Sequence, residues 1–191
     1  MNDYDYASYK YLKYCLFIEV IKSDNKKFSW FRVLRRYYHK PRDRFIFWWR
    51  IASYLHKNNH YKIAYYINRK ITMKYGPDIS LDARIAPGLS FSHFCGIVIA
   101  GIAVIGENFH IRQNTTIGAG GSRFHPKSYS NKFIKIGDNV EVGASSCIIG
   151  DALRIGNNVI IGAMSFINKD IPDNCVCYTK KENTIIISNI K

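Results

Sequence analysis

An aspartate and a histidine fifteen residues apart, Asp78 and His93, form the pair in this sequence best suited to acid–base chemistry. A carboxylate that holds one imidazole nitrogen leaves the other nitrogen free to take a proton, as a general base must. Because the unperturbed imidazole pKa is about 6.5, a useful fraction of such a histidine is neutral at physiological pH. We expect His93 to act as the base and Asp78 to orient it; a purely structural hydrogen bond is the alternative.

Two other kinds of chemistry, a thiolate nucleophile and a zinc site, could involve residues near His93. Cys95 follows His93 by two residues and could act as a thiolate nucleophile, although buried cysteine usually packs as a small apolar side chain. A zinc site built from His93, His110 and His125 is the other option, but spacings of 17 and 15 residues show no close ligand pair. We therefore expect neither a covalent intermediate on Cys95 nor a metal, and the sequence assigns no role to His110.

The residues from Ile79 to Ile167 carry an aliphatic or aromatic side chain at nearly every sixth position. A helix repeats every 3.6 residues and a strand every two, so a period of six fits neither. It is typical of a parallel β-helix, in which three hexapeptides form one triangular coil and the inward residues of successive coils stack about 4.8 Å apart. The series comprises Ile79, Ile85, Phe91, Ile97, Ile99, Ile105, Ile111, Ile117, Ile136, Val142, Ile148, Ile155, Ile161 and Ile167.

The period is interrupted in three places. It slips by two residues between Ile97 and Ile99, takes seven residues from Ile148, and leaves nineteen between Ile117 and Ile136. We expect the β-helix to cover residues 76–172, with residues 118–135 as a projecting loop, where function is often located. Residues 173–191 form a tail, in which we expect Thr184–Ser188 to add an edge strand or to pack against a neighbour.

Residues 1–75 are basic and aromatic, with 17 Lys and Arg against 5 Asp and Glu. Apolar spacing predicts helices over residues 4–22, 28–39, 42–57 and 60–74, ended by Gly76-Pro77. We expect these helices to pack their rings inward and to keep the basic groups in water. The alternative is a peripheral contact of Trp48, Trp49 and Arg50 with an anionic membrane.

Composition also limits location and partners. The five cysteines have no disulfide-like spacing, no segment reaches the roughly 20 apolar residues of a membrane span, and the first residues lack the pattern of a signal peptide. No nucleic-acid-binding module is recognisable. We expect a cytoplasmic protein, with the inner face of the membrane as the second option, and no nucleic-acid partner.

Several motifs follow one another along residues 49–172: Trp49–Leu55, Ile67–Ile71, Gly76–Ile79, Pro87–Leu89, His93, Gly96–Ile99, Ala103–Gly106, Ile111–Gln113, Thr116–Gly118, His125–Lys127 and Ile136–Gly137. Together they resemble the serine acetyltransferases. The resemblance implies a left-handed parallel β-helix, transfer of acetyl from acetyl-CoA to a hydroxyl group, and a homotrimer or a dimer of trimers. It also implies that acetyl-CoA lies between neighbouring β-helices.

The resemblance further implies roles for single residues. His93 stands where the family has its general base, Asp78 where it has the orienting aspartate, and His125 where it has a histidine of the substrate pocket. Backbone N–H groups of the glycine-containing turns are the natural oxyanion donors. We expect acetyl-CoA contacts at Gly118, Gly143, Ala144, Ala163 and Lys169.

The departures from the family concern the acceptor. Ser92 stands where the family has an aspartate that holds the amino group of serine, and Arg123 is displaced by one position from the family's loop arginine. With the short basic prefix, these departures resemble acetyltransferases of capsule, O-antigen and colanic acid clusters. We expect Ser92, Arg123 and His125 to contact a sugar hydroxyl of a surface polysaccharide or its precursor. L-serine is the alternative acceptor, and a non-catalytic hexapeptide-repeat scaffold is the second alternative.

Overall fold

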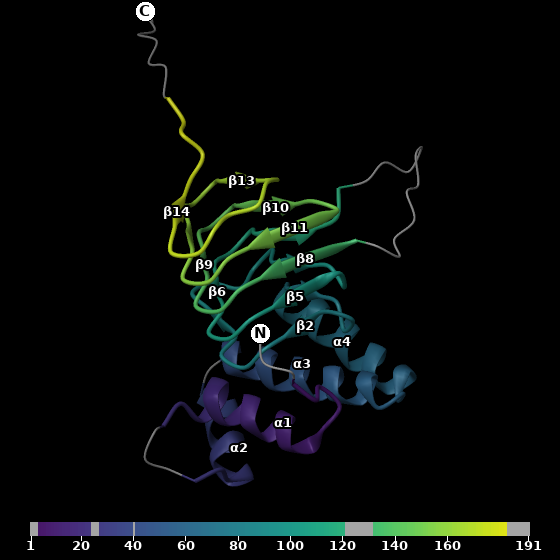
Figure 1. The fold of residues 1–191 in the computed structure, drawn as a ribbon. Coiled ribbons are helices and arrows are strands. Elements are labelled where there is room, and N and C mark those ends of the chain that lie inside the picture. Colours follow the sequence, from purple (N-terminus) through teal and green to yellow (C-terminus); the bar gives the residue numbers. More distant parts are fainter. Residues whose placement is uncertain (1–3, 24–26, 40, 121–131, 183–191) are drawn as a thin grey trace, which may run out of the picture.

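The computed structural model of the chain describes residues 4–23, 27–39, 41–120 and 132–182. Helices lie at one end of a stack of β-coils, and the described chain ends at the other (Figure 1). The helices are α1 (Tyr9–Leu16), the π-helical η1 (Phe17–Ile21) that continues it, α2 (Trp30–His39), α3 (Pro41–Lys57) and α4 (Tyr61–Tyr75). They lie where the apolar spacing predicts them.

The ends of these helices follow from local chemistry. The Ser8 hydroxyl accepts a hydrogen bond of 3.0 Å from the Tyr11 N–H and so caps α1. Pro41 occupies the first position of α3, where its missing N–H costs nothing. Gly76 ends α4 at φ 98°, a backbone conformation that side chains rarely adopt, and donates its N–H to the Thr72 carbonyl.

The fourteen short strands among the described residues form three parallel sheets, so the predicted left-handed parallel β-helix is confirmed. Sheet A contains β1 (Asp78–Ile79), β4 (Val98–Ile99), β7 (Thr116–Gly118), β10 (Cys147–Ile149) and β13 (Phe166–Ile167). Sheet B contains β2 (Arg84–Ile85), β5 (Ala103–Ile105), β8 (Phe133–Ile136) and β11 (Ala152–Ile155). Sheet C contains β3 (Ser90–Phe91), β6 (His110–Ile111), β9 (Glu141–Val142), β12 (Ile160–Ile161) and β14 (Val176–Cys177).

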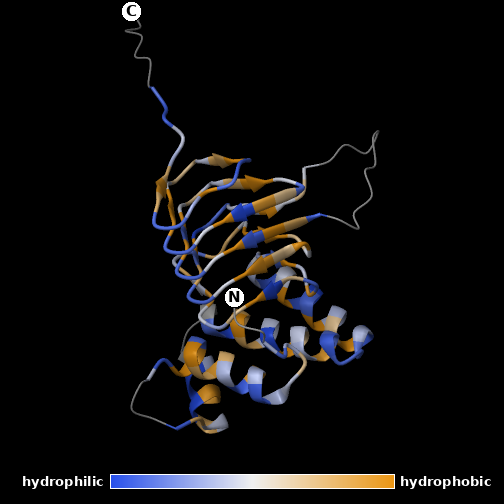
Figure 2. Cartoon of the chain, viewed as in Figure 1, coloured by the Kyte–Doolittle hydropathy of each residue, from blue (hydrophilic) through white to orange (hydrophobic). Residues whose placement is uncertain are grey.

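The core of the β-helix is made by the residues of the six-residue period. Each is at most 5% exposed, and members of the same sheet stack in register, as Ile79, Ile99 and Ile117 do in sheet A. Figure 2 shows the strands as predominantly hydrophobic. The small or branched residues that follow the period by four positions are buried too: Ala83, Ala103, Thr115, Val140, Ser146, Val159 and Ser165.

The interruptions of the period fall at two edges of the triangular prism. The C–A edge, where the chain passes from sheet C to sheet A, takes eight residues between Phe91 and Ile99 but six in each of the next three coils. The A–B edge, between sheets A and B, carries both the longer step after Ile148 and the expected loop 118–135. Residues 121–131 of that loop lie outside the described residues. The coil itself continues beyond residue 172, because β14 pairs with β12.

A buried ion pair joins the helices to the first coil. Arg50, 3% exposed, donates to both carboxylate oxygens of Glu19 and to the carbonyls of Ile85 and Ala86. One Glu19 oxygen also accepts the N–H groups of Gly88 and Leu89 at 3.0 Å. The helical end is therefore hydrogen-bonded directly to the turn that leads into β3.

The alternative of a membrane contact through Trp48, Trp49 and Arg50 finds no support in the structure. Trp49 is fully buried and donates its indole N–H to the Ile79 carbonyl, and Arg50 is consumed by the ion pair with Glu19. Trp48 is half-buried and donates to the Tyr37 hydroxyl at 3.1 Å. Apolar spacing on α3 indicates a packed face, and the first coil covers that face. None of the helices in the described ranges has the length and apolarity of a membrane span.

Candidate active site

His93 lies on the widened part of the C–A edge. The two additional residues of this corner fall between Phe91 and Gly96, and both Ser92 and His93 are exposed. Gly96 closes the corner at φ 68°, where a Cβ would collide with the Asn114 side chain of the next coil. The two-residue slip in the sequence is thus the insertion that presents the histidine to solvent.

Asp78 lies at the start of sheet A, beside the segment that follows His93. It pairs in register with Val98, and its N–H donates to the Ile97 carbonyl at 2.8 Å. The carboxylate and the imidazole are both exposed, and neither makes a hydrogen bond or ion pair with any described residue. The structure brings the two residues to the same edge of the first two coils, and their pairing stays a prediction.

Ser92 makes a contact that the sequence did not predict, because its hydroxyl lies 2.9 Å from Nε2 of His110. Nδ1 of the same ring lies 2.8 Å from the hydroxyl of Ser90, which is directly in register with His110. A neutral imidazole donates a hydrogen bond through one nitrogen and accepts one at the other, so one serine hydroxyl accepts from the ring and the other donates to it. His110 therefore holds the hydroxyl next to His93 in place.

A usable signal for this cluster was present in the sequence. Ser90 and His110 each precede a core residue by one position, and they are twenty residues apart. Twenty is one coil of eighteen plus the two-residue slip, so counting the slip as part of the first coil would have placed them side by side.

Three of the residues expected to contact acetyl-CoA lie on the C–A edge, above His93. Gly143, Ala144 and Ala163 occupy the corners of later coils, and a Cβ on Gly143 would collide with the backbone of Ala163. The corners are joined by backbone hydrogen bonds, including Met164 N–H to the Ala144 carbonyl at 2.7 Å. Gly143 is buried under the next coil, Ala144 is half-buried and Ala163 is exposed, so this edge presents small side chains in the coils above the histidine.

The other expected contacts lie on the A–B edge. Gly118 ends β7 there, and Lys169 is exposed between β13 and the bridge of Ile171 to Ile155 in sheet B. Arg123 and His125 belong to the loop of this edge and lie outside the described residues. Within one chain, the predicted contacts are therefore divided between two edges of the prism.

The described part of the chain offers no support for a Cys95 nucleophile or for a zinc site. Cys95 is exposed on the same corner as His93, with no hydrogen bond to it. No group of three or more His, Cys, Asp or Glu side chains in residues 4–23, 27–39, 41–120 and 132–182 is arranged to hold a metal ion. Of the three histidines weighed as zinc ligands, His110 has both ring nitrogens engaged by serines.

Comparison with known proteins places this geometry in context. No family model matches the sequence. The chain is 37% identical over 102 residues to serine acetyltransferase 1, chloroplastic, of Arabidopsis thaliana. This match covers 53% of this chain and 31% of that protein. It is 31% identical over 103 residues to the serine acetyltransferase of Haemophilus influenzae, covering 54% and 37%. The chain thus spans about a third of the length of these relatives.

Solved structures give the same picture. A serine acetyltransferase of Neisseria gonorrhoeae matches with a TM-score of 0.70 and 27% identity, over 95% of this chain and 67% of that one. Serine acetyltransferase isoform 3 of Entamoeba histolytica, in complex with cysteine, matches with a TM-score of 0.72 at 23% identity, over 94% and 61%; this likeness concerns the fold alone. The expected likeness to polysaccharide acetyltransferases finds no support, since all these matches are serine acetyltransferases.

Proposed function

We propose that the chain is an acetyl-CoA-dependent O-acetyltransferase, and that L-serine is the acceptor favoured by its relatives. His93 takes the proton of the acceptor hydroxyl as the oxygen attacks the thioester carbonyl; the carbon–sulfur bond then breaks and the CoA thiolate takes that proton back from the imidazolium. The observation that carries the proposal is the inserted corner, which presents His93 beside the strand of Asp78. We propose the cytoplasm as the location of this acetyl transfer.

The proposed role of Asp78 is to hold the imidazole and to stabilise its positive charge during transfer. Catalytic hydrogen bonds are often absent or long in an empty site and tighten when substrate binds. The exposed carboxylate and imidazole are compatible with such tightening, because neither must first leave a partner among the described residues. N–H groups of the neighbouring turns are the donors we propose for the oxyanion.

The division of the expected contacts between two edges supports a homotrimer. If three β-helices pack about a threefold axis, the C–A edge of one chain lies beside the A–B edge of the next, and three equal sites result. His93, Ala144 and Ala163 would come from one protomer, and Gly118 and Lys169 from its neighbour. We propose that acetyl-CoA binds in that groove. Light scattering should give about three times the 22.1 kDa chain mass, or a multiple of it; an active monomer would exclude a shared site.

A sugar hydroxyl is the second candidate acceptor, and one observation favours it. The hydroxyl of Ser92, held by His110, offers no negative charge to the α-ammonium of serine. A missing charged hydrogen bond costs about 1.5–3 kcal/mol. A neutral sugar has no ammonium group, so the same site would bind it without that loss.

The test is turnover of acetyl-CoA by the purified full chain with L-serine, free hexoses and UDP-linked hexoses. CoA should be measured by chromatography, because the free cysteines of the chain that are not buried would react with a thiol reagent. We expect serine-dependent release of CoA together with O-acetylserine. Turnover with a hexose alone would select the second candidate. Release that no hydroxyl acceptor increases would leave the scaffold as the remaining interpretation.

A further inference from the structure

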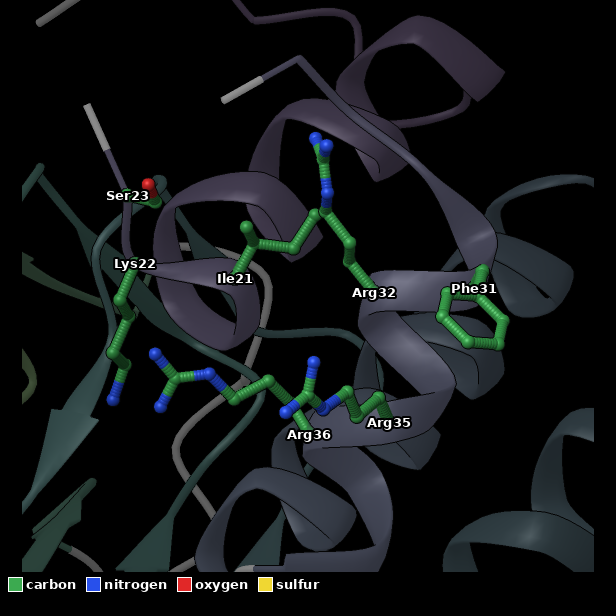
Figure 3. A pocket seen from close by; sticks show the side chains of 7 residues that line it. All are labelled: Ile21, Lys22, Ser23, Phe31, Arg32, Arg35 and Arg36. Atoms are coloured by element: carbon green, nitrogen blue, oxygen red, sulfur yellow. The ribbon is translucent and has the colours of Figure 1, made fainter. Parts of the chain in front are cut away.

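A cavity in the helical part of the molecule is unrelated to the predicted contacts with acetyl-CoA. It has a volume of about 630 Å³ and lies between the end of η1 and α2. Figure 3 shows its lining side chains, among which Lys22, Arg32, Arg35 and Arg36 are cationic. None of the lining residues that the structure describes carries a carboxylate. Four of the seven side chains that line the cavity are thus cationic.

Two of these four cationic side chains have partners among the described residues: Lys22 pairs with Asp43, and Arg32 donates to the Lys27 carbonyl. Arg35 and Arg36 make no hydrogen bond or ion pair with the residues that the structure describes, and α2 contains no acidic residue. Arg32 lies three and four positions before them, a spacing at which like charges destabilise a helix. The nearby carboxylate of Asp43 lies 3.7 Å from Lys22, outside the cavity lining, and is fully buried. Within the described part of the chain, the guanidinium groups of Arg35 and Arg36 are therefore available to bind an external anion.

The chemistry of the lining identifies the class of anion. Guanidinium groups bind phosphate through two parallel hydrogen bonds, and arginine is favoured over lysine where that fork geometry matters. The volume falls within the range of small-molecule sites, about 300–1,000 Å³. Ile21 and Phe31 add apolar surface to the wall, and Phe31 is 75% exposed. A phosphate group with an organic substituent would use both kinds of surface.

We propose that this cavity binds a phosphate or diphosphate ester through Arg35 and Arg36, with Lys22 and Arg32 completing the positive wall. The phosphate could belong to a soluble nucleotide-like molecule or to the headgroup of an anionic lipid. The proposal does not depend on acetyl transfer, because neither His93 nor the C–A edge lines the cavity.

A short series of contacts nevertheless links the cavity to the candidate active site. Lys22 lies 3.7 Å from Asp43 of α3, and Phe45 on the same helix packs against Phe91 with ring centroids 5.9 Å apart. Phe91 precedes His93 by two residues. The cavity and the inserted corner thus lie on either side of the first turns of α3.

The test is the affinity of the full chain for pyrophosphate and UDP by calorimetry, and for phosphatidylcholine vesicles with and without phosphatidylglycerol by cosedimentation. The variant is Arg35→Gln/Arg36→Gln. The matched control is Lys62→Gln/Arg69→Gln, which removes the same charge from exposed positions of α4 outside the cavity. Circular dichroism checks that both variants fold. Lys169→Gln tests whether the probe binds at the expected acetyl-CoA contact and not in the cavity.

We expect the cavity variant to lose at least tenfold in affinity for one probe, while the control and Lys169→Gln stay within about twofold of the parent. Loss for pyrophosphate or UDP identifies a soluble ligand, and loss for anionic vesicles alone identifies a headgroup. Equal losses in the cavity variant and the α4 control would reduce the effect to net charge and overturn the proposal. Failure of the parent chain to bind any probe would overturn it as well.

Discussion

Replacement of Arg50 by methionine should be among the most destabilising single changes in this chain. Arg50 is buried and donates four hydrogen bonds, two to Glu19 and two to carbonyls of the first coil. Burial by itself would lower the pKa of Arg50, but its neighbours, Glu19 among them, raise that pKa well above its ordinary value, so the side chain stays charged. Removing one partner of a buried pair costs about 3–5 kcal/mol.

The assay is urea unfolding followed by tryptophan fluorescence at one fixed protein concentration. The loss is read from the free energy of unfolding. In a separate thermal scan, a loss of that size lowers the midpoint of a chain of this length by about 6–20 °C. Arg112→Met is the matched control, because its ion pair with Glu141 is 48% and 40% exposed and should contribute less than about 1 kcal/mol.

A double variant separates the pair from simple loss of packing. Glu19→Gln keeps an oxygen that can accept the N–H groups of Gly88 and Leu89 while it removes the charge. Arg50→Met/Glu19→Gln should therefore cost at least about 2 kcal/mol less than the sum of the single losses, because no unpaired charge remains buried. Additive losses, or an Arg50→Met loss below about 1 kcal/mol, would refute this account of how the helices join the β-helix.

Three further outcomes are expected. Ser92→Asp should lower the KM for L-serine by about 10- to 100-fold by supplying a charge for the ammonium group, and Ser92→Asn should not; equal KM values would exclude this position as an acceptor contact. Burial raises the pKa of the Cys15 thiol to about 12 and also raises the pKa of the Tyr11 hydroxyl. The unfolded chain then loses these protons first as pH rises from about 9, so the free energy of unfolding should fall by at most about 1.4 kcal/mol per pH unit for each group. Cys15→Ala should flatten that slope, and an unchanged slope would contradict the argument. Cys95→Ala should change turnover little, whereas an inactive variant would indicate a thioester-enzyme mechanism.

The six-residue period was sufficient to predict the β-helix and its core. Each apolar residue of the period had only one way to avoid water, and the structure buries all of them. Asn108, Asn114, Asn139, Asn158 and Asn174 turn the corners at positive φ, which asparagine tolerates better than most residues. Local propensity and long-range packing agree at these positions, so the sequence was informative there.

The contacts between distant segments were not predictable in the same way. Spacing on α3 indicates an apolar face but not the element that covers it, so a membrane contact of Trp48, Trp49 and Arg50 stayed open as the alternative to packing. Glu19 and Arg50 are 31 residues apart on different helices, and their pairing depends on how those helices dock. The division of the expected cofactor contacts between two edges likewise appears only once the coils are stacked in space.

The most direct test of the central claim is the turnover number of His93→Ala beside that of Asp78→Asn, both at saturating acetyl-CoA and with L-serine as acceptor. If His93 takes the hydroxyl proton in the transition state, its removal should reduce turnover by about 10²–10⁴-fold, with the fold and acetyl-CoA binding retained. Asp78→Asn should be milder in the same direction, since the imidazole keeps its place but loses its orienting anion. Turnover of His93→Ala close to that of the parent chain would contradict the account.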